Sequence, residues 1–198
     1  MMKTITSIAL AVAGVSSFAA GLEPWQDPNL NEINRLPART LIVPCETEDI
    51  AIGVANGEKS KYDSRYVISL NREWDFKWKP SPEQEWQKEA KIAVPGCWQL
   101  QGDYDPPLYT NVKYPIGFDT TGNPMIDPPK DYTSYKYRNP VGLYTTTFKR
   151  PWKWYFRRTV LRFHGVSSAF RVTVNGKFAG YAEDSRLPSE FDISPYLK

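Results

Sequence analysis

Alternation of apolar and polar residues is the clearest pattern in this chain, and it predicts short β-strands. In residues 74–78 (WDFKW) aromatic residues alternate with charged ones, so one face of a strand should be buried and the other wet. Residues 170–174 (FRVTV) repeat this period, and Asn175-Gly176 then suits a type I′ turn into an apolar partner strand, residues 177–181. Two further segments have strand character, residues 142–148 and 159–164. The pattern predicts an all-β domain.

Signals for helices are sparse. Seventeen Pro and twelve Gly interrupt the chain too often for a long helix. Ser81-Pro82-Glu83 has the order of a helix start, so a short helix is expected there. Asn56-Gly57, within the charged and aperiodic residues 46–65, predicts a hairpin turn.

Two segments are expected to form polar loops. Residues 95–140 contain eight Pro and show no sustained period, and ordered stretches of this length are often functional. Residues 183–192 (EDSRLPSEFD) place acidic residues and an Arg among Ser and Pro, which favours a rigid polar loop over a core strand. Several short strands with long connections predict a jelly-roll β-sandwich with Pro-rich loops and an irregular N-terminal arm.

The first residues are typical of a secretory signal peptide. Lys3 supplies the positive charge, residues 5–15 are apolar, and Ser17-Phe18-Ala19 is a small-x-small cleavage motif. The alternative, a membrane anchor, would need about 20 apolar residues, and Thr, Ser and Gly interrupt this run. The predicted organisation is a signal peptide at 1–19, an arm at 20–65 and a β-sandwich at 66–198. The mature protein is expected to be secreted or periplasmic, with no membrane association after cleavage.

Charge and composition exclude several classes of function. The net charge of +3 is too small to indicate a polyanionic partner, so no nucleic-acid binding is expected. The basic and aromatic residues 149–158 are better interpreted as a solvated connection between two strands. His164, the single His, is expected to be a strand residue, and no His/Cys group has the spacing of a zinc site. Cys45 and Cys97 could pair in an oxidising compartment, but the sequence does not show that they are close.

Four strings, taken in order, resemble the N-terminal sugar-binding domain of the glycoside hydrolase family 2 β-galactosidases. They are residues 69–76 (SLNREWDF), 98–102 (WQLQG), 109–115 (YTNVKYP) and 183–192 (EDSRLPSEFD). The resemblance implies a galactose-binding-domain-like fold that is incomplete at residue 198. It also implies further domains, including a catalytic barrel that carries the two catalytic Glu. No catalytic residue is therefore expected in this chain.

The same resemblance implies two substrate-binding residues, Asn111 and Asp184, which would reach from this domain to the galactosyl unit of a β-galactoside. Amide and carboxylate groups provide the donors and acceptors that sugar hydroxyls need. Asp184 would also supply part of a Na⁺ site. No cofactor is expected in this chain, whereas Na⁺ and Mg²⁺ are implied for the full-length enzyme, which could be a homo-oligomer. Two alternatives remain open: a stand-alone, lectin-like carbohydrate-binding module, and a domain with only a structural or oligomerisation role.

Overall fold

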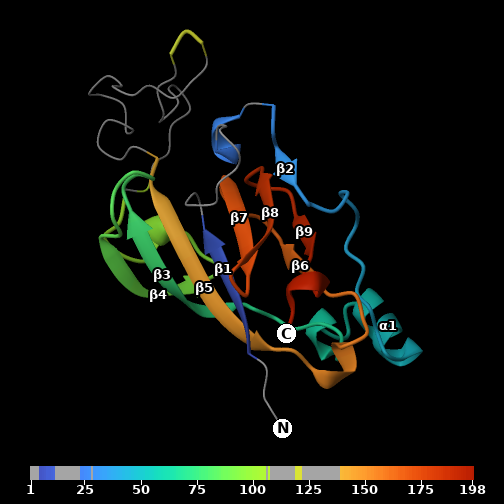
Figure 1. Cartoon of the computed structure of the whole chain (residues 1–198). Helices are drawn as coiled ribbons and strands as arrows, with labels where there is room; N and C mark the ends of the chain where they lie inside the picture. Colours follow the sequence, from blue (N-terminus) through green and yellow to red (C-terminus); the bar gives the residue numbers. More distant parts are fainter. Residues whose placement is uncertain (1–4, 12–22, 28, 106, 108–118, 122–138) are drawn as a thin grey trace.

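The protein is an antiparallel β-structure with a single α-helix in the part described, as Figure 1 shows for a computed structural model. The structure describes residues 5–11, 23–27, 29–105, 107, 119–121 and 139–198. The helix is α1 (Glu48–Ala55). The strands are β1 (Ile5–Ala11), β2 (Glu32–Ile33), β3 (Arg72–Lys79), β4 (Lys88–Val94), β5 (Val141–Lys149), β6 (Val160–Phe163), β7 (Ala169–Val174), β8 (Lys177–Glu183) and β9 (Ser189–Asp192).

The strands form two sheets. The larger has seven strands in the order β2-β8-β7-β1-β5-β3-β4, and the smaller pairs β6 with β9. All the pairings are antiparallel. The predicted all-β fold class is confirmed, and the arrangement is consistent with a sugar-binding jelly-roll domain.

The main core joins the two sheets. Its buried aromatic and aliphatic side chains come from β5, β6, β7, β8 and β9, with Ile8 of β1 among them. Phe170 of β7 and Phe191 of β9 are both buried, and their rings meet edge to face with centroids 6.0 Å apart. Gly180 of β8 makes room for Phe191, because a Cβ there would lie 2.4 Å from the Phe191 ring.

Strand β3 shows the predicted alternation. Trp74, Phe76 and Trp78 are buried, whereas Asp75 between them is exposed. Phe76 and Trp78 form a second core cluster with Ile92 and Tyr104. One face of this strand is therefore core and the other solvent, as the period of two requires.

The β7–β8 hairpin also forms as predicted. Asn175 and Gly176 have φ of 51° and 78°, which are the positive values of a type I′ turn. The same dipeptide type at 56–57 behaves differently. Thr47 caps helix α1 by accepting a hydrogen bond from the Ile50 amide, and Gly57, with φ of 76°, follows the C-terminal end. The predicted hairpin turn at Asn56-Gly57 is wrong, because a capped helix precedes it.

The short helix expected after Ser81 is absent. Residues 81–87 instead form the turn of the β3–β4 hairpin, in which the Gln87 amide donates to the Trp78 carbonyl. Strand β4 begins at Lys88, so too few residues remain after Ser81 for a helix to form. The pairing of β3 with β4 along its length outweighs a weak local helix signal.

Part of the predicted signal peptide lies in the larger sheet. Strand β1, from this segment, lies between β5 and β7 (Figure 1). Cleavage of residues 1–19, the arm boundary and export stay predictions. Among the described residues, no helix is long and apolar enough to cross a membrane.

Candidate functional site

Asp184 lies in a tight loop between β8 and β9. Its φ is 102°, a left-handed conformation that Asp tolerates better than most residues. Its Oδ1 accepts hydrogen bonds from the backbone amides of Arg186 (3.0 Å) and Leu187 (3.3 Å). The carboxylate therefore fixes the backbone of its own loop, as Asp does in Asx turns.

The environment of Asp184 favours its charged form. The hydrogen bond from the Arg186 amide lowers the pKa of this carboxyl most; burial opposes it, and the Leu187 amide and the Arg35 guanidinium lower the pKa further. The side chain is exposed at the surface. Asp184 is thus an anionic acceptor whose Oδ1 is already used, which leaves Oδ2 for a partner.

The N-terminal arm supports this loop from one side. The Leu36 amide donates to the Glu190 carbonyl at 2.8 Å, and the Arg35 guanidinium donates to the Pro188 carbonyl at 3.3 Å. On the other side the Ser185 hydroxyl lies 3.4 Å from that of Ser167. The loop is therefore held at both flanks by segments that are distant in sequence.

The loop is shorter than the sequence suggested. Residues 183–192 were expected to be one polar loop, but Glu183 ends β8 and residues 189–192 form β9. Ser189, Glu190 and Phe191 are buried. The prediction of a loop is wrong for these residues, because partners elsewhere neutralise the charge that appeared to exclude a strand.

Those partners are two Arg residues that flank Glu190. Arg39 of the arm donates from Nε to Oε2 at 2.7 Å, and Arg162 of β6 donates from Nη1 to Oε1 at 2.7 Å. Burial alone would raise the pKa of Glu190, but the two Arg hydrogen bonds and charges hold it below its usual value. Sequence reasoning missed this triad, since the three residues lie on separate segments with no motif to connect them.

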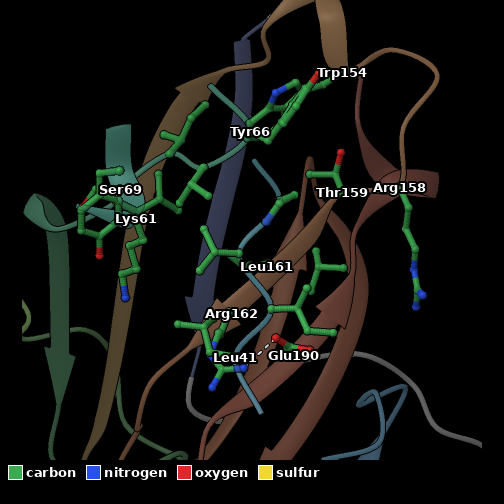
Figure 2. A pocket seen from close by; sticks show the side chains of 18 of the residues that line it. Leu41, Lys61, Tyr66, Ser69, Trp154, Arg158, Thr159, Leu161, Arg162 and Glu190 are labelled. Atoms are coloured by element: carbon green, nitrogen blue, oxygen red, sulfur yellow. Dashed lines mark hydrogen bonds and ion pairs between the residues drawn. The ribbon is translucent and has the colours of Figure 1, made fainter. Parts of the chain in front are cut away.

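The triad borders a pocket of about 720 Å³ (Figure 2). The arm, residues 61–71, the end of β5 and strand β6 form its walls, and Asp184 is not among its lining residues. Lys61 and His164 meet in this pocket, with Nζ and Nε2 3.3 Å apart. Burial, then the charges of Lys61 and Arg162, lower the pKa of His164. The pocket is thus lined by both apolar and cationic groups.

The carboxylates near the loop are all engaged. Glu183 accepts a hydrogen bond from the Tyr181 hydroxyl at 2.5 Å, Asp184 binds two amides, and Glu190 binds two guanidinium groups. A retaining glycosidase needs a nucleophile and an acid/base about 5–5.5 Å apart and free to react. Each of these three groups accepts hydrogen bonds from neighbouring side chains or amides that hold the β8–β9 region in place.

The other residues with possible chemical roles are accounted for as follows. Asn111 lies outside the described residues. Trp98 and Tyr104 pack against Phe76, with ring centroids 5.8 Å and 5.1 Å from it, so their rings contribute to the second core cluster and are not free to stack on a sugar.

The two cysteines and the basic run have structural explanations. Cys45 and Cys97 are not bonded to each other: both are free thiols. The run at 149–158 connects β5 to β6, as predicted.

The donors around Asp184 do not by themselves fit a Na⁺ site. A hard cation needs several oxygen ligands, and Asp184 offers one carboxylate whose Oδ1 is already bonded to amides. The described residues contain no cluster of three or more His, Cys, Asp or Glu that could hold a metal ion.

Comparison with known proteins identifies the domain. The family profile described as "Glycosyl hydrolases family 2, sugar binding domain" matches residues 67–198. The chain is also 40% identical over 191 residues to a beta-galactosidase from Priestia megaterium. That match covers 91% of this chain but 17% of the relative, so the chain spans about a sixth of that protein's length. The chain belongs to glycosyl hydrolase family 2 and carries the sugar-binding domain of that family.

Proposed function

We propose that this chain works as the N-terminal sugar-binding domain of an enzyme that hydrolyses terminal β-D-galactose from β-galactosides. The observation that carries the proposal is the 40% identity to a beta-galactosidase across 91% of the chain. In this proposal the chain contributes contacts to galactose and does not perform the hydrolysis. The nucleophile and the acid/base come from a catalytic barrel elsewhere in the enzyme.

Asp184 and Asn111 supply the proposed galactose contacts. The fixed loop supports this role for Asp184, because a rigid acceptor loses little entropy when it binds a sugar hydroxyl. Its Oδ2 remains for the sugar while Oδ1 holds the loop. Asn111 would add a neutral amide. Any contribution of Asp184 to a Na⁺ site would require ligands from other parts of the enzyme.

A domain replacement tests the proposal. Residues 23–198 would replace the matching segment of the Priestia megaterium beta-galactosidase, and hydrolysis of an aryl β-galactoside would be measured. We expect the chimaera to turn over substrate and the same enzyme without this segment to be inactive. A chimaera that folds and assembles but shows no hydrolysis would contradict the proposal.

Site variants in the active chimaera test the two contacts. Charged hydrogen bonds are worth about 1.5–3 kcal/mol and neutral ones about 0.5–1.5. Asp184→Ala should therefore lower kcat/KM by about tenfold to a few hundredfold, and Asn111→Ala by a few-fold to about tenfold. Asp27→Asn is a matched control, because Asp27 also accepts a backbone amide, from Asn29, in a turn outside this loop.

Two other functions predict different results. A stand-alone lectin-like module would bind galactosides as the isolated chain, whereas a contributor of two contacts should show no binding by titration calorimetry. A purely structural domain would be required for assembly, yet Asp184→Ala and Asn111→Ala would both retain wild-type kcat/KM. Wild-type kinetics in both variants would thus leave the domain with a structural role.

A further inference from the structure

The N-terminal arm closes the base of the loop that carries Asp184. On the β8 side, the Glu183 amide donates a hydrogen bond to the Asn31 carbonyl at 3.0 Å, and β2 pairs with β8 (Figure 1). On the β9 side, the backbone of Arg35 forms a β-bridge with Phe191. A single short segment of the arm therefore contacts both strands between which the loop is held.

The Arg35 side chain reaches from the arm to the loop itself. Its Nη2 donates to the Pro188 carbonyl at 3.3 Å, and its Nη1 donates to Oε2 of Glu32 at 3.2 Å. Only 12% of the Arg35 side chain is exposed. Because the guanidinium is planar and its two Nη groups are bonded to different partners, its orientation is restricted. The positive charge of Arg35 is thereby held in one place beside the loop.

Asp184 depends on contacts from outside its loop. A φ of 102° is uncommon for any residue but Gly, and such a conformation persists only where the surrounding structure fixes it. The Arg186 and Leu187 amides that bind Oδ1 belong to the same loop and move with it. They set the shape of the loop but not its position on the domain. The bond from Arg35 to Pro188 constrains that position, because the arm is paired with β8.

We propose that Arg35 is a positioning residue for the galactose contact of Asp184. It holds the Asp184 loop against the arm, so that Oδ2 is presented at one place, and it makes no contact with the sugar itself. This inference rests on the proposed function, in which Asp184 accepts a hydrogen bond from galactose. Its consequence is that Arg35 affects hydrolysis only through Asp184. Loss of Arg35 should therefore have no further effect once the Asp184 carboxylate has been removed.

A double-mutant cycle in the active chimaera tests this consequence. Arg35→Gln should lower kcat/KM by about threefold to tenfold, less than Asp184→Ala does, because a displaced acceptor still binds the sugar part of the time. The double variant should equal Asp184→Ala within about twofold, since two residues that act through one contact are not additive. Arg158→Gln is the control and should keep wild-type kcat/KM, because Arg158 pairs with Asp192 at the end of β9 that is remote from the loop.

Hydrogen exchange in the full chain gives a second measurement, which does not depend on sugar binding. The Arg186 and Leu187 amides should exchange about tenfold faster in Arg35→Gln, because loss of a hydrogen bond from a charged donor lets the loop open more often. Arg35→Lys should give an intermediate rate, since Lys keeps the charge but lacks the planar fork that bonds two partners. Arg158→Gln should leave both exchange rates unchanged.

The outcomes separate this inference from the proposed function. Wild-type exchange in Arg35→Gln overturns the inference, as does wild-type exchange in Arg35→Lys if the Gln variant does not fold. An equal loss of kcat/KM on Arg35→Gln with and without the Asp184 carboxylate also overturns it, because Arg35 would then act by another route. A low kcat/KM in Asp184→Ala beside wild-type kinetics in Arg35→Gln contradicts only the inference. Wild-type kinetics in Asp184→Ala would instead contradict the galactose contact that the proposed function assigns to Asp184.

Discussion

Replacement of Glu190 by Gln should destabilise the domain substantially. The Glu190 side chain is only 8% exposed, and that of Arg162 is 15% exposed. Gln keeps one acceptor oxygen but presents an NH₂ group to the second guanidinium. Loss of a hydrogen bond between charged groups costs about 1.5–3 kcal/mol at Arg162, where burial limits screening. Arg39 is 40% exposed, so its bond should add less than about 1 kcal/mol.

Loss of the two hydrogen bonds should together lower the free energy of unfolding by about 2–4 kcal/mol. For a domain of this size, each kcal/mol lowers the melting temperature by about 2–4 °C. We therefore expect the melting temperature of Glu190→Gln to be about 4–16 °C lower at pH 7, as measured by circular dichroism. Glu89→Gln is the matched control, because Glu89 pairs with Lys77 at 2.5 Å but its side chain is 64% exposed. That change should move the melting temperature by about 2 °C or less.

The same variant tests the sign of the pH dependence. The folded-state pKa of Glu190 is lowered, so the contribution of its carboxylate to the free energy of unfolding is fully present above the unfolded-state pKa of about 4.3. The contribution is lost as the pH falls through the folded-state pKa, when the carboxylate is protonated. The difference in melting temperature between wild type and Glu190→Gln should therefore be largest at pH 7 and become smaller below about pH 4. Equal melting of Glu190→Gln and Glu89→Gln at pH 7 would refute the reasoning.

Three further predictions concern the loop, the core and the thiols. Asp184→Ala should melt lower than Asp184→Asn, because Asn keeps an acceptor for the Arg186 and Leu187 amides and tolerates positive φ; equal melting would argue against the amide contacts. Gly180→Ala should lower the free energy of unfolding, measured in urea, by about 1–3 kcal/mol, since its Cβ would overlap the Phe191 ring. Phe191→Leu should destabilise the Gly180→Ala variant less than it destabilises the wild type, because the smaller side chain relieves that overlap. Without reductant, a maleimide should label exposed Cys97 faster than half-buried Cys45, and an absence of reactive thiols would indicate a disulfide.

Local signals in the sequence sufficed for some elements and misled for others. The alternation at Trp74–Trp78 and the turn at Asn175-Gly176 depend on neighbouring residues, so both could be predicted. Asn56-Gly57 carries the same turn signal, yet it ends a helix because Thr47 caps a segment that precedes it. Gly has positive φ in both places, but Asn has it only at Asn175, because Asn56 keeps the helical φ of −83°.

The site was harder to predict than the fold for a related reason. Glu190 looked like a loop residue because a lone carboxylate is costly to bury. Its partners are 28 and 151 residues away in the sequence, so no local pattern could reveal them. The family resemblance identified the segment around Asp184 but not the two Arg residues that hold its far end. The sequence motifs were therefore enough to locate the loop, whereas the ion pairs that position it could be identified only from the structure.

The three carboxylates near the β8–β9 loop differ in how many of their oxygens are already hydrogen-bonded. A catalytic carboxyl changes its protonation state or forms a bond during turnover. Glu190 uses both carboxylate oxygens for Arg side chains, Glu183 uses Oε1 for the Tyr181 hydroxyl, and Asp184 uses Oδ1 for its own loop. Asp184, directly after β8, therefore presents Oδ2 from a loop that its own Oδ1 holds in place. In the function that we propose, this oxygen orients a sugar hydroxyl and groups from another domain cleave the glycosidic bond.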